Sequence, residues 1–195
     1  MKKIISALMC MGILAAALTG CGYNDALENS NKKATQATES TQAENAPVIK
    51  DSDYQDNLAG LADYLADKGY IEKKKDKETQ KEVIDDSKVT KMDAKLIGAK
   101  EGNKYLVGKN IYIEIYAYDT ANLDNTAKDV ISSVKADGKF EILDLPAVEA
   151  FLSDNGKYLM VYTDITIKKD NPDTTAQNYV IRQECVEDFK AFHAE

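Results

Sequence analysis

The chain has 195 residues, of which 44% are apolar and 30% charged, and its 25 basic and 33 acidic side chains give a net charge of −8 at pH 7. Arg182 is the only arginine, so a surface that neutralises the phosphates of nucleic acid is not expected. His193 is the only histidine, which excludes Ser-His-Asp triads and poly-histidine zinc sites. We expect no nucleic-acid partner, no metal and no cofactor.

Residues 1–20 have the pattern of a secretory signal peptide, with a short basic start followed by an almost unbroken apolar run. The run ends in Leu18-Thr19-Gly20-Cys21, which resembles the lipobox of bacterial lipoproteins. This resemblance implies cleavage before Cys21 and a diacylglyceryl thioether on its sulfur. The alternative is a plain signal peptide, or an uncleaved anchor helix, that contains a cysteine.

This interpretation also determines the expected state of the other two cysteines. Cys10 leaves with the signal peptide and Cys21 carries the lipid, so only Cys185 keeps a thiol and the mature chain forms no intramolecular disulfide. Cys185 lies on the apolar stripe of a predicted helix, which favours a small core residue over a reactive thiol.

Residues 21–52 form the lipidated cysteine and a tether rich in Asn, Thr, Ser, Gln and Ala. Such a segment buries too little apolar surface to offset its ordering entropy. Residues 53–195 are then a single domain, long enough to bury a core. The tether and lipid place this domain on the outer, extracytoplasmic face of a cell membrane.

Apolar residues at helical spacing predict three helices in the domain, over residues 54–69, 123–138 and 171–192. Gly69 and Gly138 stand where a left-handed residue ends a helix. The third helix is predicted to begin at Asn171-Pro172, since Asn caps helices and Pro suits the first helical position.

The segments between the first two helices are less regular. The charged stretch at residues 72–82 is interpreted as a solvated loop or frayed turn, and residues 92–99 as either a short helix or a strand. Residues 104–107 and 111–118 read as two strands joined near Gly108-Lys109-Asn110.

A second hairpin is indicated by Asn155-Gly156, a strong two-residue turn signal. With this turn, Leu152 pairs with Leu159 and Ala150 with Val161. The chain is therefore predicted to adopt an α+β fold, in which a largely antiparallel sheet of about four to five strands packs with three helices.

Aromatic residues alternate with aliphatic ones along these strands, which predicts one aliphatic sheet face and one tyrosine-rich face. Tyrosine combines a large apolar area with a polar tip and suits a surface that holds a partner. The alternatives are that a helix or the tether packs over these rings, or that they are half-buried strand residues. The candidate ligand-binding residues are Tyr112, Tyr116, Tyr118, Phe151, Tyr158 and Tyr162.

Glu114 and Glu149 are placed on the same predicted face, where two carboxylates could act as the acid and nucleophile of a glycoside hydrolase. The acidic runs at residues 85–86 and 170–173 lack the spacing of a calcium loop, so capping and solvation explain them. His193 is interpreted as a cap near a helix C-terminus.

The run at residues 152–160, together with Ile97-Gly98-Ala99 and the lipobox, resembles small uncharacterised lipoproteins of Gram-positive Firmicutes. That resemblance implies a cell-surface setting and an α+β domain, and no activity. We therefore expect a lipid-anchored, non-enzymatic binding module that contacts an envelope protein, peptide or glycan. The alternatives are a surface hydrolase acting on glycan and a purely structural envelope lipoprotein.

Overall fold

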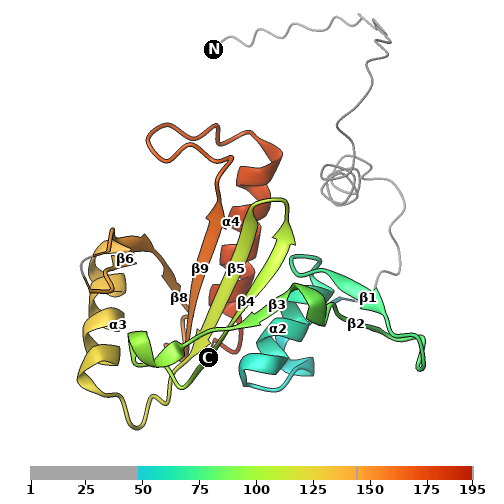
Figure 1. Ribbon diagram of the computed structural model, residues 1–195, viewed down its shortest axis with the longest axis horizontal. Helices are drawn as coiled ribbons and strands as arrows, with labels where there is room; N and C mark the ends of the chain where they lie inside the picture. Colours follow the sequence, from blue (N-terminus) through green and yellow to red (C-terminus); the bar gives the residue numbers. More distant parts are fainter. Residues whose placement is uncertain (1–47, 144, 195) are drawn as a thin grey trace, which may run out of the picture.

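A five-stranded antiparallel sheet forms the centre of the domain, with the strand order β3-β4-β5-β9-β8 (Figure 1). The computed structural model describes residues 48–143 and 145–194. The predicted signal peptide, Cys21 and all but the last residues of the tether lie outside this range. The strands are β3 (Val89–Lys91), β4 (Glu101–Gly108), β5 (Ile111–Ala117), β8 (Phe151–Leu152) and β9 (Tyr158–Asp164).

The first long helix, α2 (Leu58–Asp67), follows a short 3-10 turn, η1 (Asp51–Asp53). Its N-terminus is capped by Asn57, whose side chain accepts a hydrogen bond from the Gly60 amide at 2.8 Å. Gly69 has a φ of +85°, and the next amide donates to the Leu65 carbonyl, as expected for a helix that ends on a left-handed glycine. The predicted helix is confirmed, although it starts later than residue 54.

The second helix, α3 (Asn125–Asp137), is closed at both ends by local signals in the sequence. The Asp124 carboxylate accepts a hydrogen bond from the Ala127 amide at 2.7 Å. Gly138 has a φ of +67° and its amide donates to the Val134 carbonyl. Both the helix and its predicted end at Gly138 are confirmed.

The third helix, α4 (Gln177–Ala191), begins later than Asn171-Pro172 predicted. The carboxylate of Asp173 accepts hydrogen bonds from the amide and hydroxyl of Thr175, so it closes a tight turn in the preceding loop. The Asn178 amide then donates to the Thr166 hydroxyl at 2.7 Å and ties the first turn of α4 to the end of β9. The prediction of an Asn171 cap is wrong because the local turn intervenes.

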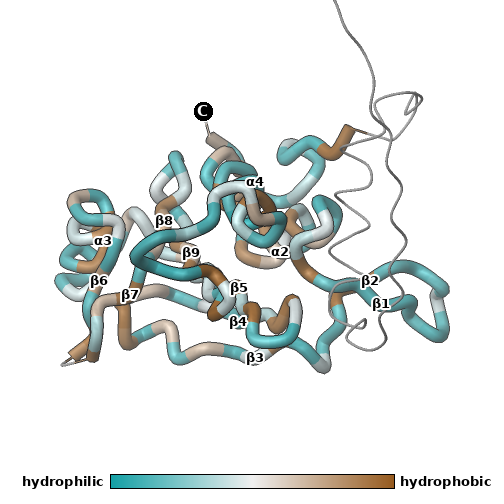
Figure 2. The backbone as a smooth tube through the Cα atoms, turned by 90° about the horizontal axis from the view of Figure 1, so that it is seen from above, coloured by the Kyte–Doolittle hydropathy of each residue, from teal (hydrophilic) through white to brown (hydrophobic). Residues whose placement is uncertain are grey.

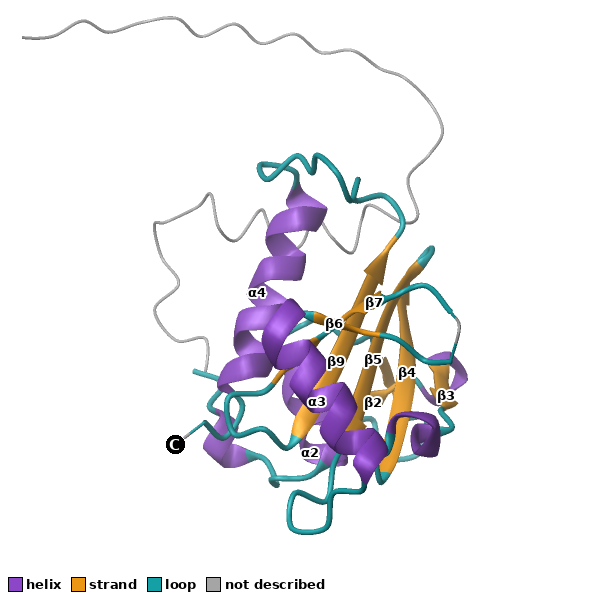
Figure 3. Cartoon of the chain, turned by 90° about the vertical axis from the view of Figure 1, so that its left-hand side faces the viewer, coloured by secondary structure: helices purple, strands orange, loops and turns teal. Residues whose placement is uncertain are grey.

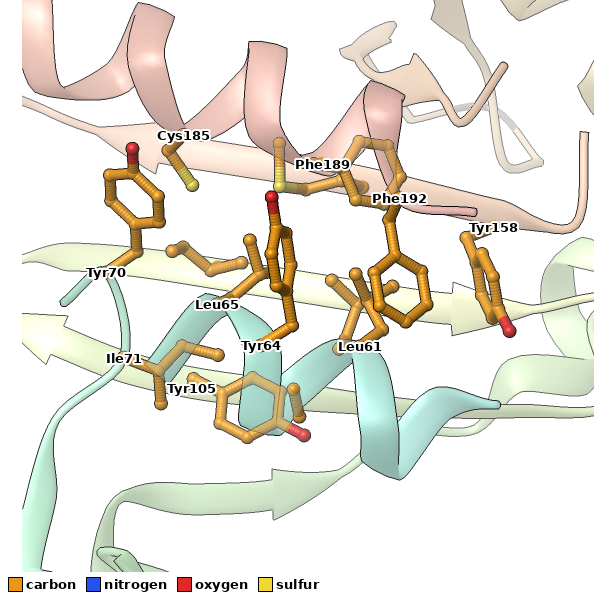
Figure 4. Packing of buried hydrophobic residues seen from close by; sticks show 14 of the residues in the cluster. Leu61, Tyr64, Leu65, Tyr70, Ile71, Tyr105, Tyr158, Cys185, Phe189 and Phe192 are labelled. Atoms are coloured by element: carbon orange, nitrogen blue, oxygen red, sulfur yellow. The ribbon is translucent and has the colours of Figure 1, made fainter. Parts of the chain in front are cut away.

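The sheet is covered on both faces. On one face, α2 and α4 lie side by side over the strands (Figure 2) and enclose the first core, in which Leu61, Phe189 and Phe192 are fully buried (Figure 4). On the opposite face, the second core is enclosed by α3, which contacts β8 (Figure 3), and by the 3-10 turn η3 (Ala94–Ile97), which contacts β4. Cys185 lies in the first core, which confirms its predicted packing role.

Two segments between α2 and β4 resolve as short elements. The charged stretch predicted as a solvated loop contains a hairpin of β1 (Lys73–Lys75) and β2 (Glu82–Ile84). Residues 86–97 form the turn η2 (Asp86–Lys88), the edge strand β3 and η3. The loop prediction for residues 72–82 was wrong because an Asp76 turn, whose carboxylate accepts from the amide and hydroxyl of Thr79, reverses the chain.

The Asn155-Gly156 hairpin has the predicted register at its tip, where Leu152 pairs with Leu159. The prediction fails at Ala150, whose amide donates to the Gly138 carbonyl and not to Val161. The arm is therefore split between β8, which pairs with β9, and β7 (Val148–Glu149), which pairs with β6 (Lys139–Phe140). This break separates Glu149 from the main sheet.

Buried tyrosines contribute to the stability of the fold through their hydroxyl groups. Tyr158 donates to Asp56 at 2.8 Å, Tyr70 to Asp188 at 2.6 Å and Tyr116 to Glu114 at 2.8 Å. Burial, reinforced by these carboxylates, raises the pKa of all three phenols above the ordinary value of 10.0. Burial also raises the pKa of Tyr118 and Tyr162.

Alkaline pH is therefore expected to unfold the domain cooperatively. Below pH 10 the phenols are neutral in both the folded and the unfolded chain, so their stabilising contribution is complete. Above pH 10 the phenols of the unfolded chain ionise while those of the folded chain stay neutral, so the free energy of unfolding falls. The tyrosinate absorbance of the buried phenols should then rise in the same transition in which the far-ultraviolet circular dichroism disappears. Ionisation of all the phenols while the dichroism is unchanged would contradict this expectation.

Candidate functional site

The predicted tyrosine-rich face does not exist as one surface. In the register between β5 and β9, Ile115 is opposite Met160 and Tyr116 is opposite Leu159. The aliphatic side of β5 therefore shares a face with the aromatic side of β9, because directly paired residues point the same way. Five of the six candidate rings are divided between the two cores, Tyr112 belongs to neither, and the prediction of a single aromatic face is wrong.

Most of these rings are also covered. Tyr158 and Tyr162 lie in the core beneath α2 and α4, and Tyr116 and Tyr118 in the core beneath α3 and η3. The Tyr118 hydroxyl donates to the Ile97 carbonyl at 3.3 Å. The alternative that helices pack over the rings is thus the arrangement that the structure shows, and these four tyrosines act as core residues.

The two remaining candidates are partly buried and lie on different elements. On β5, the Tyr112 ring lies 4.4 Å from the Lys104 ammonium, a cation–π contact. On β8, the Phe151 ring lies 5.2 Å from the guanidinium carbon of Arg182 and 5.6 Å from the Lys190 ammonium. Phe151 and one edge of Tyr162 also line the groove described below.

Glu114 and Glu149, the carboxylates considered for hydrolysis, are not brought together. Glu114 forms an ion pair with Lys104 at 2.9 Å and accepts a hydrogen bond from the hydroxyl of Tyr116. Glu149 is paired with Arg182 at 2.7 Å and lines a groove that Glu114 does not reach. The split of the strand at Ala150 explains the separation, since it turns β7 toward β6.

The other side chains considered from the sequence have local partners. Asp85 accepts hydrogen bonds from the amide and hydroxyl of Ser87, and these lower the pKa of its carboxyl. His193 does not cap α4: its amide donates to Asp51 and its Nε2 lies 3.0 Å from the Tyr54 carbonyl. The ring thus joins the C-terminal residues to the segment before α2, because the chain turns at His193 with a φ of +49°.

A groove of about 1280 Å³ runs between α3, α4 and the β7–β9 region. One wall is the end of α3 and the start of β6, and the floor is β8 with the outer half of β9. The opposite wall is α4, which contributes Tyr179, Arg182 and Lys190, and the loop after β9 closes one end. Figure 3 shows α3 and α4 flanking this end of the sheet.

Arg182 is the buried cation of this groove. It is 9% exposed, and its guanidinium lies 5.2 Å from the Phe151 ring and 2.7 Å from the carboxylate of Glu149. The Glu149 side chain is 62% exposed, so the pair joins a buried cation to an anion in solvent. Every buried side-chain nitrogen or oxygen of the described residues has a hydrogen-bond partner, so any guanidinium donor without a partner is open to the groove.

The groove carries positive charge in an anionic protein. Its basic residues outnumber its acidic ones, while the whole chain has a net charge of −8. The basic residues are Lys135, Lys139, Lys168, Lys169, Arg182 and Lys190, and the acidic ones are Asp137, Glu149, Asp154 and Asp164. The local cations attract anionic groups to this groove, whereas the net negative charge of the chain repels such groups from most of the remaining surface.

Sequence reasoning treated Arg182 only as evidence against nucleic-acid binding. A signal for its burial was nevertheless present, because Arg182, Cys185, Val186 and Phe189 follow the i, i+3, i+4, i+7 spacing of one helix face. These four are the buried residues of α4. An arginine on an apolar stripe requires a partner or a polar cavity, and here it has both.

Comparisons with known proteins add no assignment, since no protein-family model, curated protein or solved structure matches the chain. Among the helices of residues 48–143 and 145–194, none has the length and apolarity needed to cross a bilayer.

Proposed function

We propose that this chain is a lipid-anchored binding module of the bacterial cell envelope, and that its ligand binds in the groove beside Arg182. The lipobox-like sequence before Cys21 supports the anchor. The groove supports the binding role, because it joins a large concave surface with one buried guanidinium and an aromatic ring. The ligand is expected to carry negative charge.

The single observation that carries the proposal is the environment of Arg182. A guanidinium has five donors in a rigid fork, and the one ion pair that Arg182 makes among the described residues is with a side chain that is mostly in solvent. A buried arginine whose only role was structural would be expected to have a buried partner as well. The Phe151 ring lies 5.2 Å from the guanidinium carbon and lines the same groove, and arginine beside an aromatic ring is a common feature of recognition sites.

The proposed binding site is not the aromatic sheet face that the sequence predicts. The aromatic sheet face is replaced by a groove in which Phe151 and Tyr179 provide the aromatic contacts. The Lys104, Tyr112 and Glu114 cluster lies on another part of the sheet, and it is already internally paired.

Site-specific photo-cross-linking on intact cells tests the location. A photoreactive residue at Ile165, which lines the groove and is 68% exposed, is expected to cross-link to an envelope component. The matched control is Val83, which is 38% exposed on the β1–β2 hairpin and does not line the groove. Equal cross-linking at both positions, or cross-linking at Val83 alone, would contradict the proposal.

A further inference from the structure

We infer that the ligand of this groove is an acidic peptide segment, and that Glu149 occupies the place of one of its carboxylates until the ligand displaces it. This inference rests on the proposed function, because it names the ligand class of the same groove. Three properties of the groove carry it: the exposure of Glu149, the distribution of cations and the size of the cavity.

Glu149 is bound in a way that permits replacement. Its Oε2 lies 2.7 Å from an Arg182 nitrogen, but its side chain is 62% exposed and its strand, β7, is only two residues long. Ion pairs with one partner in solvent contribute little to stability. A ligand carboxylate that also makes other contacts in the groove can therefore take this position at small cost.

The geometry of the pair indicates which anion the groove accepts. The Arg182 guanidinium already contacts a carboxylate, that of Glu149, and the Phe151 ring. A carboxylate from a ligand reproduces this arrangement, and the ring next to it offers contact to an apolar neighbour of the acidic residue. The apolar residues Leu152 and Ile165 extend the same lining.

The cations of the groove are spread along its length. Lys135 and Lys139 lie at the α3–β6 side, whereas Lys168 and Lys169 lie on the loop after β9. A volume of about 1280 Å³ is larger than that of most small-molecule pockets and suits several residues of an extended chain. A peptide with acidic residues separated by apolar ones matches both the charges and the lining.

The test measures binding of a short fluorescein-labelled peptide, in which glutamates alternate with leucines, to the full chain in detergent by fluorescence anisotropy. Arg182→Gln is expected to weaken binding at least tenfold, because the charge-assisted hydrogen bonds are lost. Glu149→Gln is expected to tighten binding about twofold to fivefold, because the internal competitor is removed. The peptide with glutamine in place of glutamate should not bind to any of these chains.

Lys104→Gln is the matched control, since it breaks an ion pair of similar length with Glu114 outside the groove. It should leave peptide affinity unchanged, and thermal unfolding of each variant confirms that it is folded. Arg182→Lys keeps the positive charge but loses the forked donors of the guanidinium group, so it should also weaken binding. This variant provides the test if Arg182→Gln fails to fold.

The outcomes separate this inference from the proposed function. If Glu149→Gln lowers the melting temperature and leaves peptide affinity unchanged, Glu149 is a structural partner and the inference is wrong, while the groove is still a binding site. If polyphosphate binds in an Arg182-dependent manner and the peptide does not, the ligand class is wrong. The proposed function is tested separately by cross-linking, and it fails if Ile165 does not cross-link more than Val83.

Discussion

Gly98→Ala is expected to lower the free energy of unfolding by about 2 to 5 kcal/mol, because it combines backbone strain with overpacking. Gly98 ends η3 with a φ of +68°, a backbone conformation that residues other than glycine rarely adopt. A Cβ atom there would lie 2.4 Å from the Ala127 amide nitrogen and 2.6 Å from the Asp124 carboxylate. The substitution therefore disturbs the cap of α3, and denaturant titration measures the loss.

Gly138→Ala is the matched control for this effect. Gly138 has nearly the same backbone conformation, with a φ of +67°, but a Cβ atom would meet nothing within 4 Å. Only the strain remains, with an expected loss of about 1 to 2 kcal/mol. Equal losses for the two variants would show that the contact between η3 and the start of α3 contributes no specific packing.

Cys21→Ser is expected to release the protein from the membrane fraction and to abolish its labelling by a radioactive fatty acid. Each buried methylene contributes about 0.8 kcal/mol, so two acyl chains anchor a protein firmly and their absence leaves it unanchored. Cys185→Ala is the control, because Cys185 is buried in the first core and is not expected to affect lipidation. Fatty-acid labelling that persists in Cys21→Ser would contradict the lipobox interpretation.

The parts of the fold that the sequence predicts well are those set by neighbouring residues. Gly69 and Gly138 end their helices as expected, since the left-handed conformation is a local property of glycine. Leu152 pairs with Leu159 as expected, although the turn is formed by residues 153–156, where the Gly156 amide donates to the Ser153 carbonyl, and not by Asn155-Gly156 alone. The α+β class follows from these elements together.

The pairing of strands that are distant in the sequence could not be predicted in the same way. The faces of β5 and β9 were assigned separately, and nothing local determines whether Ile115 or Tyr116 is opposite Met160. A shift of one residue moves every side chain to the other face. This ambiguity produced the predicted tyrosine face, although the alternation within each strand was correct.

The groove depends on a break that has no clear signal in the sequence. The periodicity of residues 148–152 continues through Ala150, yet the chain changes partner there from β9 to β6. This change carries Glu149 to Arg182 and opens space between α3 and α4. The helical spacing of Arg182 could have indicated its burial, but not the groove that it lines.

The central claim, that the groove beside Arg182 binds an acidic ligand, is tested most directly by nuclear magnetic resonance. Because Arg182 is the only arginine, the chain has one arginine side-chain Nε–H signal. Titration with the glutamate–leucine peptide should shift this signal to saturation, together with the backbone amides of β7, β8 and α4. An unmoved arginine signal, with peptide-dependent shifts confined to other elements, would contradict the account.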